Sequence, residues 1–273
     1  MEQIETIGAI EQRELTRIRI SVRNLVEFIF RSGDIDNRIG KGAQKEAMQE
    51  GSRMHRKIQG RMGMEYRAEV PLKLEVPQEE YVLALEGRAD GIITNAEGGV
   101  IVDEIKCMYT DVTRFEEPIF VHKAQAMCYA YIYALQNGLD QISVQLTYCD
   151  LDTEEICRFE EAFSFFWLER WFQDMMEAYR KWTDFQFAWR KIRQTSIQTL
   201  EFPFPYREGQ HKLVGDVYRT IHRKKILFIQ APTGTGKTIS TLFPAIRAVG
   251  ENLGDKIFYL TAKTITRTVA KDT

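Results

Sequence analysis

Apolar residues alternate with polar ones, or run together, in three stretches of the first half of the chain. These stretches are residues 66–74, 81–94 and 100–108, and Gly98-Gly99 lies between the last two. A period of two is typical of a β-strand with one buried face, and a Gly-Gly pair is typical of a hairpin turn. We therefore expect three strands here, the last two joined as a hairpin.

On either side of these strands, apolar residues recur every three or four positions, which predicts helices. Ser21 is a suitable N-cap for a helix over residues 22–31, and a second helix is expected over residues 43–59. A third helix, over residues 119–136, ends just before Gly138, which can adopt the left-handed C-cap conformation. The same reasoning gives the remaining elements of this part: strands at 141–149 and 155–159, and an aromatic-rich helix at 163–190.

The C-terminal part shows a different order of elements. Pro203 and Pro205 mark residues 197–205 as a linker. After the linker we expect a helix at 209–222, a buried strand at 226–229, a helix beginning at Thr238 and a strand at 257–261. Alternating helices and strands indicate an α/β domain. We therefore predict two domains, residues 1–195 and residues 196–273.

Composition narrows the class of protein. A hydrophobic content of 44% and a charged content of 28% are ordinary for a soluble globular chain. No apolar run approaches a membrane span and the N-terminus is acidic, so we expect a cytoplasmic protein without membrane contact. The four cysteines lack the C-x-x-C spacing of a zinc ribbon. A net charge of −2 neither indicates nor excludes nucleic acid, since a local basic groove is sufficient.

Two carboxylates and a lysine are expected to meet on the predicted hairpin. A period of two puts Glu104 and Lys106 on one face of their strand and Asp103 on the other, while Asp90 lies on the neighbouring strand. Such a set can hold a hard divalent cation beside an ammonium group, which is what phosphodiester hydrolysis requires. Each element also has a structural interpretation: Glu-x-Lys is a common cross-strand pair, and Asp90 before Gly91 is suited to a turn.

Three residues on predicted helices could extend this set. His55 can offer a ring nitrogen to a metal, and Gln125 and Tyr129 share a helix face because they are four residues apart. A lone histidine is more often an ordinary helix residue than a ligand, and Gln125 and Tyr129 could form an ordinary amphipathic edge. The interpretation therefore depends on all of these residues occurring together and in order.

Together these residues resemble the PD-(D/E)XK nucleases, and in particular their RecB-like branch. The matching motifs, in the order of that branch, are Gly51-x-x-x-His55, Gly87-x-x-Asp90, Asp103-Glu-x-Lys106 and Gln125-x-x-x-Tyr129. The resemblance implies an α/β fold with a restriction-endonuclease-like mixed sheet flanked by helices. It also implies Mg²⁺ or Mn²⁺ held by His55, Asp90, Glu104 and the Ile105 carbonyl. Lys106 would be the catalytic lysine alongside Asp90 and Glu104, and Gln125 and Tyr129 would bind DNA or support the site.

Two departures from the family pattern qualify this resemblance. Ala89 stands where the family name has proline, a frequent change in this branch. Some relatives bind an iron–sulphur cluster through four cysteines around the nuclease core. Those positions are not cysteine here, so we expect no cluster in this domain.

Residues 225–238 carry a phosphate-binding P-loop between a predicted strand and a predicted helix. Glycines let the backbone curl so that N–H groups point at an anion, and the helix N-terminus adds partial positive charge. The expected nucleotide-binding residues of the loop are Gly234, Thr235, Gly236, Lys237 and Thr238. The first motif position is Ala231 where the strict form has glycine. The cofactor implied is ATP.

The segments flanking the P-loop resemble the XPD/DinG-like branch of superfamily 2 helicases. Arg207 and Gln210 are similar to the segment that reads adenine, and Thr261, Lys263 and Arg267 are similar to a loop that grips the phosphates of single-stranded DNA. Nothing after Thr238 supplies an acidic residue behind an apolar strand. We therefore expect a truncated P-loop NTPase (RecA-like) lobe that does not hydrolyse ATP, from the front part of a longer protein.

The resulting hypothesis is an ATP-dependent DNA helicase with a metal-dependent deoxyribonuclease domain, acting in DNA repair on DNA that is single-stranded or has single-stranded ends. One alternative is a non-catalytic DNA-binding module that feeds a helicase motor. Another is a stand-alone restriction-type nuclease whose P-loop is incidental. The aromatic residues between 163 and 190 could stack on bases, but their helical spacing favours packing.

Overall fold

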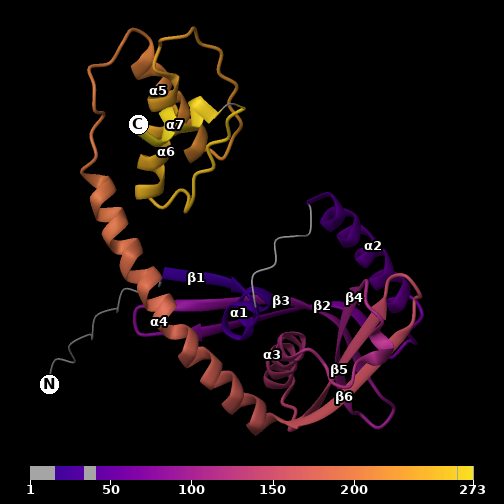
Figure 1. Cartoon of the computed structure of the whole chain (residues 1–273). Helices are drawn as coiled ribbons and strands as arrows, with labels where there is room; N and C mark the ends of the chain where they lie inside the picture. The colour runs from indigo at the N-terminus through magenta and orange to yellow at the C-terminus, as the bar shows by residue number, and fades with distance from the viewer. Residues whose placement is uncertain (1–15, 34–40, 263, 273) are drawn as a thin grey trace, which may run out of the picture. The chain divides into compact units, whose positions relative to one another are not determined.

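The computed structural model describes residues 16–33, 41–262 and 264–272, with the backbone alone for residues 41–47 and 265–266. The chain divides into two compact units, Met1–Thr183 and Asp184–Thr273, and the division falls within helix α4 (Phe165–Gln198). Figure 1 labels the helices and strands of both units. Among the described helices, none combines the length and the apolar character needed to cross a membrane.

In its described residues, the first unit is a mixed α/β structure built on a six-stranded sheet. The strands are β1 (Thr16–Ser21), β2 (Tyr66–Pro77), β3 (Tyr81–Thr94), β4 (Val100–Met108), β5 (Gln141–Asp150) and β6 (Ile156–Ser164). The pairs β1–β3 and β4–β5 are parallel, whereas β2–β3, β3–β4 and β5–β6 are antiparallel. The prediction of a mixed sheet flanked by helices is therefore confirmed.

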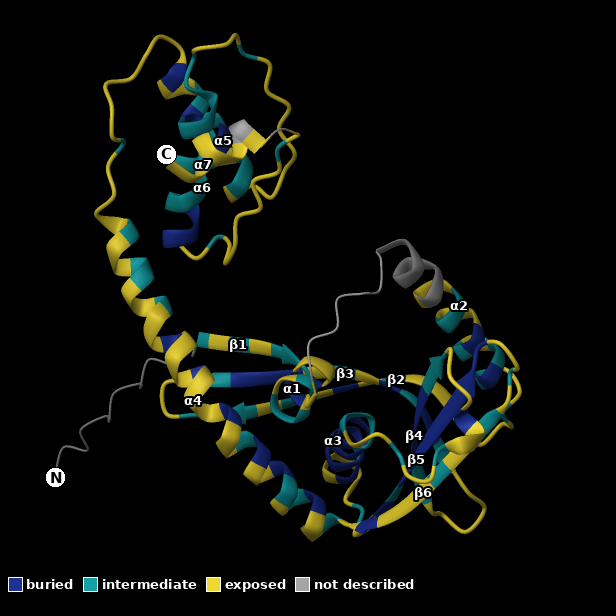
Figure 2. Cartoon of the chain, viewed as in Figure 1, coloured by how far each residue is buried: buried dark blue, intermediate teal, exposed yellow. Residues whose placement is uncertain are grey.

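Helices cover this sheet on both faces. Helices α1 (Val22–Phe30), α3 (Phe120–Asn137) and α4 contribute to one large apolar core with the sheet, and Figure 2 shows α3 largely buried. Helix α2 (Lys41–Gln59) packs through Met54 and Ile58 on a separate cluster that includes Ile105. Because side chains alternate along a strand, Ile105 faces away from Val102 of the main core, so α2 lies on the opposite face.

The predicted helix ends are confirmed by their capping geometry. The Ser21 hydroxyl accepts a hydrogen bond from the Asn24 N–H at 3.1 Å, and Gly138 has the left-handed φ of 64°. Phe172 and Tyr179 of α4 are buried in the main core, which supports packing as the role of the aromatic residues in this half of the helix.

The β3–β4 ladder ends early and leaves a fork in the sheet. Its last register pair is Gly91 with Asp103, and from Glu86 towards its N-terminus β3 is paired instead with β1. Strand β2 runs along the other edge of β3 throughout. Asp90 is therefore the first residue of β3 beyond the fork, and Glu104 to Lys106 are the first residues of β4 beyond it.

The second unit contains α5 (Gln210–His222), α6 (Lys237–Gly250) and α7 (Thr264–Asp272), together with the C-terminal part of α4. Residues 226–229 and 257–261 form neither helix nor strand in the described chain. Phe228 is 94% exposed and Leu260 is 91% exposed, and both segments are largely yellow in Figure 2. The predictions of a buried strand at 226–229 and of a strand at 257–261 are therefore wrong, because a strand requires a neighbour for its N–H and C=O groups.

Candidate functional site

The fork in the sheet opens into a cavity of about 890 Å³. It is bounded by α1, α2, α3 and by strands β2, β3 and β4. Side chains from both faces of the sheet reach it because the strands diverge here. The residues that line it include Arg23, Glu27, Gly51, Ser52, His55, Arg56, Glu69, Asp90, Glu104, Ile105, Lys106, Cys107, His122 and Gln125.

The two predicted acidic residues are held differently. Asp90 Oδ2 accepts a hydrogen bond from the Ile105 N–H at 2.7 Å, and its Oδ1 lies 3.8 Å from His55 Nδ1. Glu104 Oε1 accepts a hydrogen bond from Lys106 Nζ at 2.5 Å. The second oxygen of Glu104, Oε2, is buried without a hydrogen-bond partner among the described residues. A buried carboxylate oxygen without a partner is costly unless a proton or a cation compensates it.

Burial also sets the protonation of this pair. It raises the pKa of Glu104 to about 8, against the attraction of Lys106, and the charge of Asp90 raises it further. Burial raises the pKa of Asp90 as well, opposed by His55 and by the hydrogen bond from Ile105. Desolvation therefore disfavours the charged forms of these two neighbouring carboxylates, and a bound cation would favour those forms again.

Lys106 and the predicted residues of α3 form a connected group. Lys106 Nζ also donates to Gln125 Oε1 at 3.3 Å. Tyr129, one turn further along α3, is only 3% exposed, and its ring lies over Gly87, where a Cβ atom would come within 2.6 Å of it. Gly87 therefore makes room for Tyr129. The burial of Tyr129 favours the supporting role for this residue over direct contact with DNA.

Asp103, on the opposite face of β4, belongs to a different network. Its Oδ1 accepts hydrogen bonds from Thr147 at 2.7 Å and from Gln145 at 3.0 Å, and its Oδ2 accepts one from the Tyr66 hydroxyl at 3.1 Å. Asp103 is fully buried and its hydrogen-bonding capacity is used. It is therefore a structural residue of the sheet, although it is part of the same sequence motif.

The geometry stops short of a preformed metal shell. Within the described residues, no three His, Cys, Asp or Glu side chains are grouped closely enough to hold a metal ion. His55, Asp90, Glu104 and Ile105 nevertheless line the same cavity.

Several further residues line the cavity without belonging to any of the predicted motifs, notably Arg23, Arg56, Glu69 and His122. Burial lowers the pKa of His122 to about 4, and its Nδ1 lies 3.2 Å from the Tyr148 hydroxyl. Arg56 donates to the Ser52 carbonyl at 3.2 Å. None of these residues belongs to a recognisable short motif, and only the fold brings them to the fork.

The second candidate site is the P-loop of the second unit. Gly234 and Gly236 have left-handed φ values of 83° and 72°, and α6 begins directly afterwards at Lys237. Lys237 Nζ donates to the carbonyls of Ala231 at 2.9 Å and Pro232 at 2.5 Å. The lysine thus folds back over its own loop, where carbonyl groups occupy its donors.

The predicted adenine-reading segment lies against this loop. The Arg207 guanidinium donates to the Gly234 carbonyl, and the Arg207 N–H donates to Gln210 Oε1 at 3.0 Å. Gln210 is 5% exposed, and its Nε2 lies 2.4 Å from the position that a Cβ atom on Gly236 would take. A cavity of about 280 Å³ is lined by residues that include Gln210, Ala231, Pro232 and Thr235.

The other predicted residues of this unit are less informative. Thr238 lies in the first turn of α6, Thr261 is half-buried outside any helix or strand, and Arg267 is exposed on α7. Lys263 lies outside the described residues.

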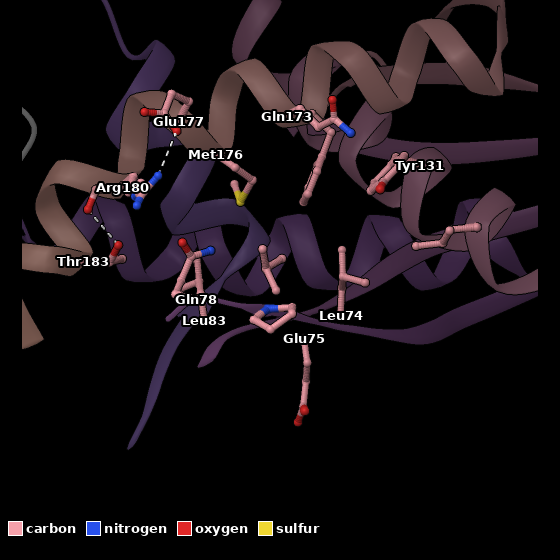
Figure 3. A pocket seen from close by; sticks show the side chains of 14 residues that line it. Leu74, Glu75, Gln78, Leu83, Tyr131, Gln173, Met176, Glu177, Arg180 and Thr183 are labelled. Carbon is pink, nitrogen blue, oxygen red and sulfur yellow. Dashed lines mark hydrogen bonds and ion pairs between the residues drawn. The ribbon is translucent and has the colours of Figure 1, made fainter. Parts of the chain in front are cut away.

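A further cavity of about 450 Å³ lies in the first unit between the end of β2 and helices α3 and α4. Figure 3 shows Leu74, Tyr131 and Met176 around it, with the ion pair of Arg180 and Glu177, at 3.8 Å, on its rim. None of the site residues predicted for the fork or for the P-loop lines this cavity.

Comparison with known proteins gives limited likenesses. No family model matches the chain. A 47-residue stretch is 43% identical to the probable ATP-dependent helicase MJ0942 of Methanocaldococcus jannaschii, which amounts to 17% of this chain and 7% of that protein. The crystal structure of SSO0001 aligns with 59% of this chain and 76% of its own at 22% identity, but with a TM-score of 0.38 it is too distant to support a fold assignment.

Proposed function

We propose that the chain is part of a helicase-related protein that binds ATP and DNA and cuts DNA with the help of a divalent cation. The nuclease part, with a restriction-endonuclease-like fold, comprises residues 1–195, and residues 196–273 begin a superfamily 2 helicase lobe. The observation that carries the nuclease proposal is the cavity at the fork. It is lined together by Asp90, Glu104, Lys106 and His55, and among the described residues Glu104 Oε2 is buried there without a hydrogen-bond partner.

The residues of the fork fit a hard divalent cation such as Mg²⁺ or Mn²⁺. Oxygen ligands are preferred by such ions, and Asp90, Glu104 and the Ile105 carbonyl would supply them, with His55 at the rim. The pKa values of Asp90 and Glu104 are raised by burial, so both carboxylates would gain from a positive charge. When bound, the ion would polarise a phosphate and lower the pKa of a water molecule.

The chain's own residues would orient the reaction. Lys106 is held between Glu104 and Gln125, so its ammonium group is fixed at the cavity wall. There it can donate a hydrogen bond to a phosphate oxygen or to the attacking water, and offset charge in the transition state. Arg23 and Arg56 add cationic groups along the same cavity, which suits a phosphodiester backbone.

The helicase-related part of the proposal rests on the P-loop and the short likeness to a helicase-named protein. Left-handed glycines, the start of α6 and Lys237 together provide an anion site, and Arg207 and Gln210 lie beside it. Binding of the adenine by Gln210, and of DNA by Thr261, Lys263 and Arg267, belongs to this proposal.

The proposal is tested by incubating the full chain with end-labelled single-stranded and double-stranded DNA in Mg²⁺ or Mn²⁺. We expect cleavage by the wild type and none by Glu104→Gln, which keeps the side-chain volume but removes the charge. If the wild type and the variant bind DNA equally well and neither cuts it, the alternative of a non-catalytic binding module is favoured. Cutting without any ATP affinity would favour the stand-alone nuclease.

A further inference from the structure

Glu69 has an unusual backbone conformation beside the fork. Its φ is 56°, in the left-handed region, although it lies within strand β2. Its neighbours pair as Ala68 with Gly91 and Val70 with Ala89, so Glu69 stands directly opposite Asp90. A non-glycine residue in this region costs free energy and persists only where the surroundings impose it, a situation common at functional sites.

The side chain of Glu69 is fixed by two partners. Its Oε1 accepts a hydrogen bond from Gln59 Nε2 at 3.1 Å, and its Oε2 pairs with Arg88 Nε at 2.6 Å. The same Gln59 nitrogen donates to the backbone carbonyl of Asp90 at 3.0 Å. The side-chain amide of Gln59 therefore connects Glu69 of β2 to Asp90 of β3.

Gln59 also connects this network to His55. Both lie on α2, and because they are four residues apart they share a helix face. Fixing Gln59 against Asp90 therefore fixes the rotation of α2 that brings His55 Nδ1 to 3.8 Å from Asp90 Oδ1. Groups that orient metal ligands without touching the metal commonly change metal affinity by about 10- to 100-fold when removed.

A second left-handed glutamate provides a natural comparison. Glu154 has a φ of 59° and also holds α2, by pairing with Lys57; it lies 4.0 Å from Arg61, just after the helix. Among the described contacts of Glu154, none reaches Asp90 or His55. The two glutamates thus share backbone strain and a tie to α2, but differ in their connection to the fork.

We propose that Glu69 is a positioning residue, which through Gln59 holds His55 and Asp90 in the arrangement that a divalent cation needs. This inference rests on the proposed function, since it assumes a cation at the fork. It adds to that function a residue outside every motif of the sequence.

The test uses the full chain and four proteins: wild type, Glu69→Gly, Glu69→Gln and Glu154→Gly. Glycine accepts a left-handed φ, so both glycine variants remove a carboxylate and relieve backbone strain equally. Mn²⁺ affinity is measured by isothermal titration calorimetry without DNA, and circular dichroism with urea unfolding checks that each variant folds. We expect the dissociation constant to rise about 10-fold or more in Glu69→Gly. We expect Glu154→Gly and Glu69→Gln to bind as the wild type does, since glutamine keeps an oxygen for Gln59.

Other results would overturn the inference in distinguishable ways. Equal losses of Mn²⁺ affinity in Glu69→Gly and Glu154→Gly would mean that any contact that holds α2 supports the cation site, and that the link through Gln59 is not specific. Wild-type affinity in Glu69→Gly would mean that Glu69 positions nothing, and weak binding in Glu69→Gln would mean that the hydrogen bond to Gln59 is not the link. Absence of Mn²⁺ binding by the wild type would instead reject the proposed function itself.

Discussion

The carboxylate of Asp90 accepts a hydrogen bond from the backbone N–H of Ile105 at 2.7 Å, at the point where the β3–β4 ladder has ended. Ile105 pairs with Thr147 of β5 on one side, and the Asp90 side chain takes the place of the β3 partner that is missing on the other side. Ile105 is fully buried, so its N–H would otherwise be unpaired. Asp90 has a structural task at the fork as well as the proposed one.

These two tasks can be separated by paired substitutions. Asp90→Asn keeps an oxygen for the Ile105 N–H but loses the negative charge, whereas Asp90→Ala loses both. We expect Asp90→Ala to lower the free energy of unfolding by about 1–3 kcal/mol relative to Asp90→Asn, measured in urea. Both variants should lose Mn²⁺ affinity. Equal stability of the two would show that the hydrogen bond contributes nothing, and retained affinity in Asp90→Asn would show that the charge is not needed.

His122 should make the stability of the first unit depend on pH. Burial lowers its pKa to about 4, the charges of Lys106 and Arg23 act in the same direction, and Glu27 opposes them. An unfolded histidine titrates near 6.5, so between about pH 6.5 and 4 the unfolded state binds more protons, and this contribution is lost as pH falls.

His122→Gln removes that titration, so the comparison is made between variant and wild type. At pH 7 the wild type has the full contribution, and the difference between the two free energies of unfolding should shrink by up to about 2 kcal/mol by pH 4.5. The raised pKa of Glu104 acts in the opposite sense but is present in both proteins. A difference that stays constant between these pH values would contradict the assignment.

The P-loop should tolerate no side chain at Gly236. Its φ is 72°, and a Cβ atom there would lie 2.4 Å from Gln210 Nε2. We expect Gly236→Ala and Lys237→Ala each to weaken binding of a fluorescent ATP analogue about tenfold or more, a loss of about 1.4 kcal/mol. Gly254→Ala is a control for the added methyl group alone, since nothing lies within 4 Å of its Cβ position. Unchanged affinity in Gly236→Ala would argue against nucleotide binding by this loop.

The exposed apolar segment at residues 226–229 should promote self-association. Phe228 is 94% exposed, so Phe228→Ser should change the free energy of unfolding by no more than about 0.5 kcal/mol while reducing association at high concentration. Val217→Ser, at a position only 9% exposed on α5, should instead destabilise the unit. Sedimentation velocity over a concentration series measures the first effect, and identical behaviour of Phe228→Ser and wild type would contradict it.

Helix ends can be predicted from the sequence because they depend on the residue type at a single position. Ser21 and Gly138 mark helix ends because capping depends on one side chain or one φ angle. The sequence pattern does not predict strand β1, although Ile18 and Ile20 alternate with arginines, because a short strand next to a helix gives a weak period. The exposed segment around Phe228 shows the opposite error, since an apolar run predicts a strand only if partners exist.

The candidate site was predictable only in part for a related reason. Asp90, Glu104 and Lys106 could be paired from strand periodicity alone. Glu69 and His122 could not, because their approach depends on where the β3–β4 ladder ends and on how α2 and α3 pack. Long-range register and helix rotation leave no short motif in the sequence.

The most direct test of the central claim is to locate Mn²⁺ by anomalous scattering in crystals of the full chain. The account predicts one strong peak at the fork, bonded to a carboxylate oxygen of Asp90 and to one of Glu104, and its loss in Glu104→Gln. A peak elsewhere only, or an unchanged peak in the variant, would contradict a cation site at the fork.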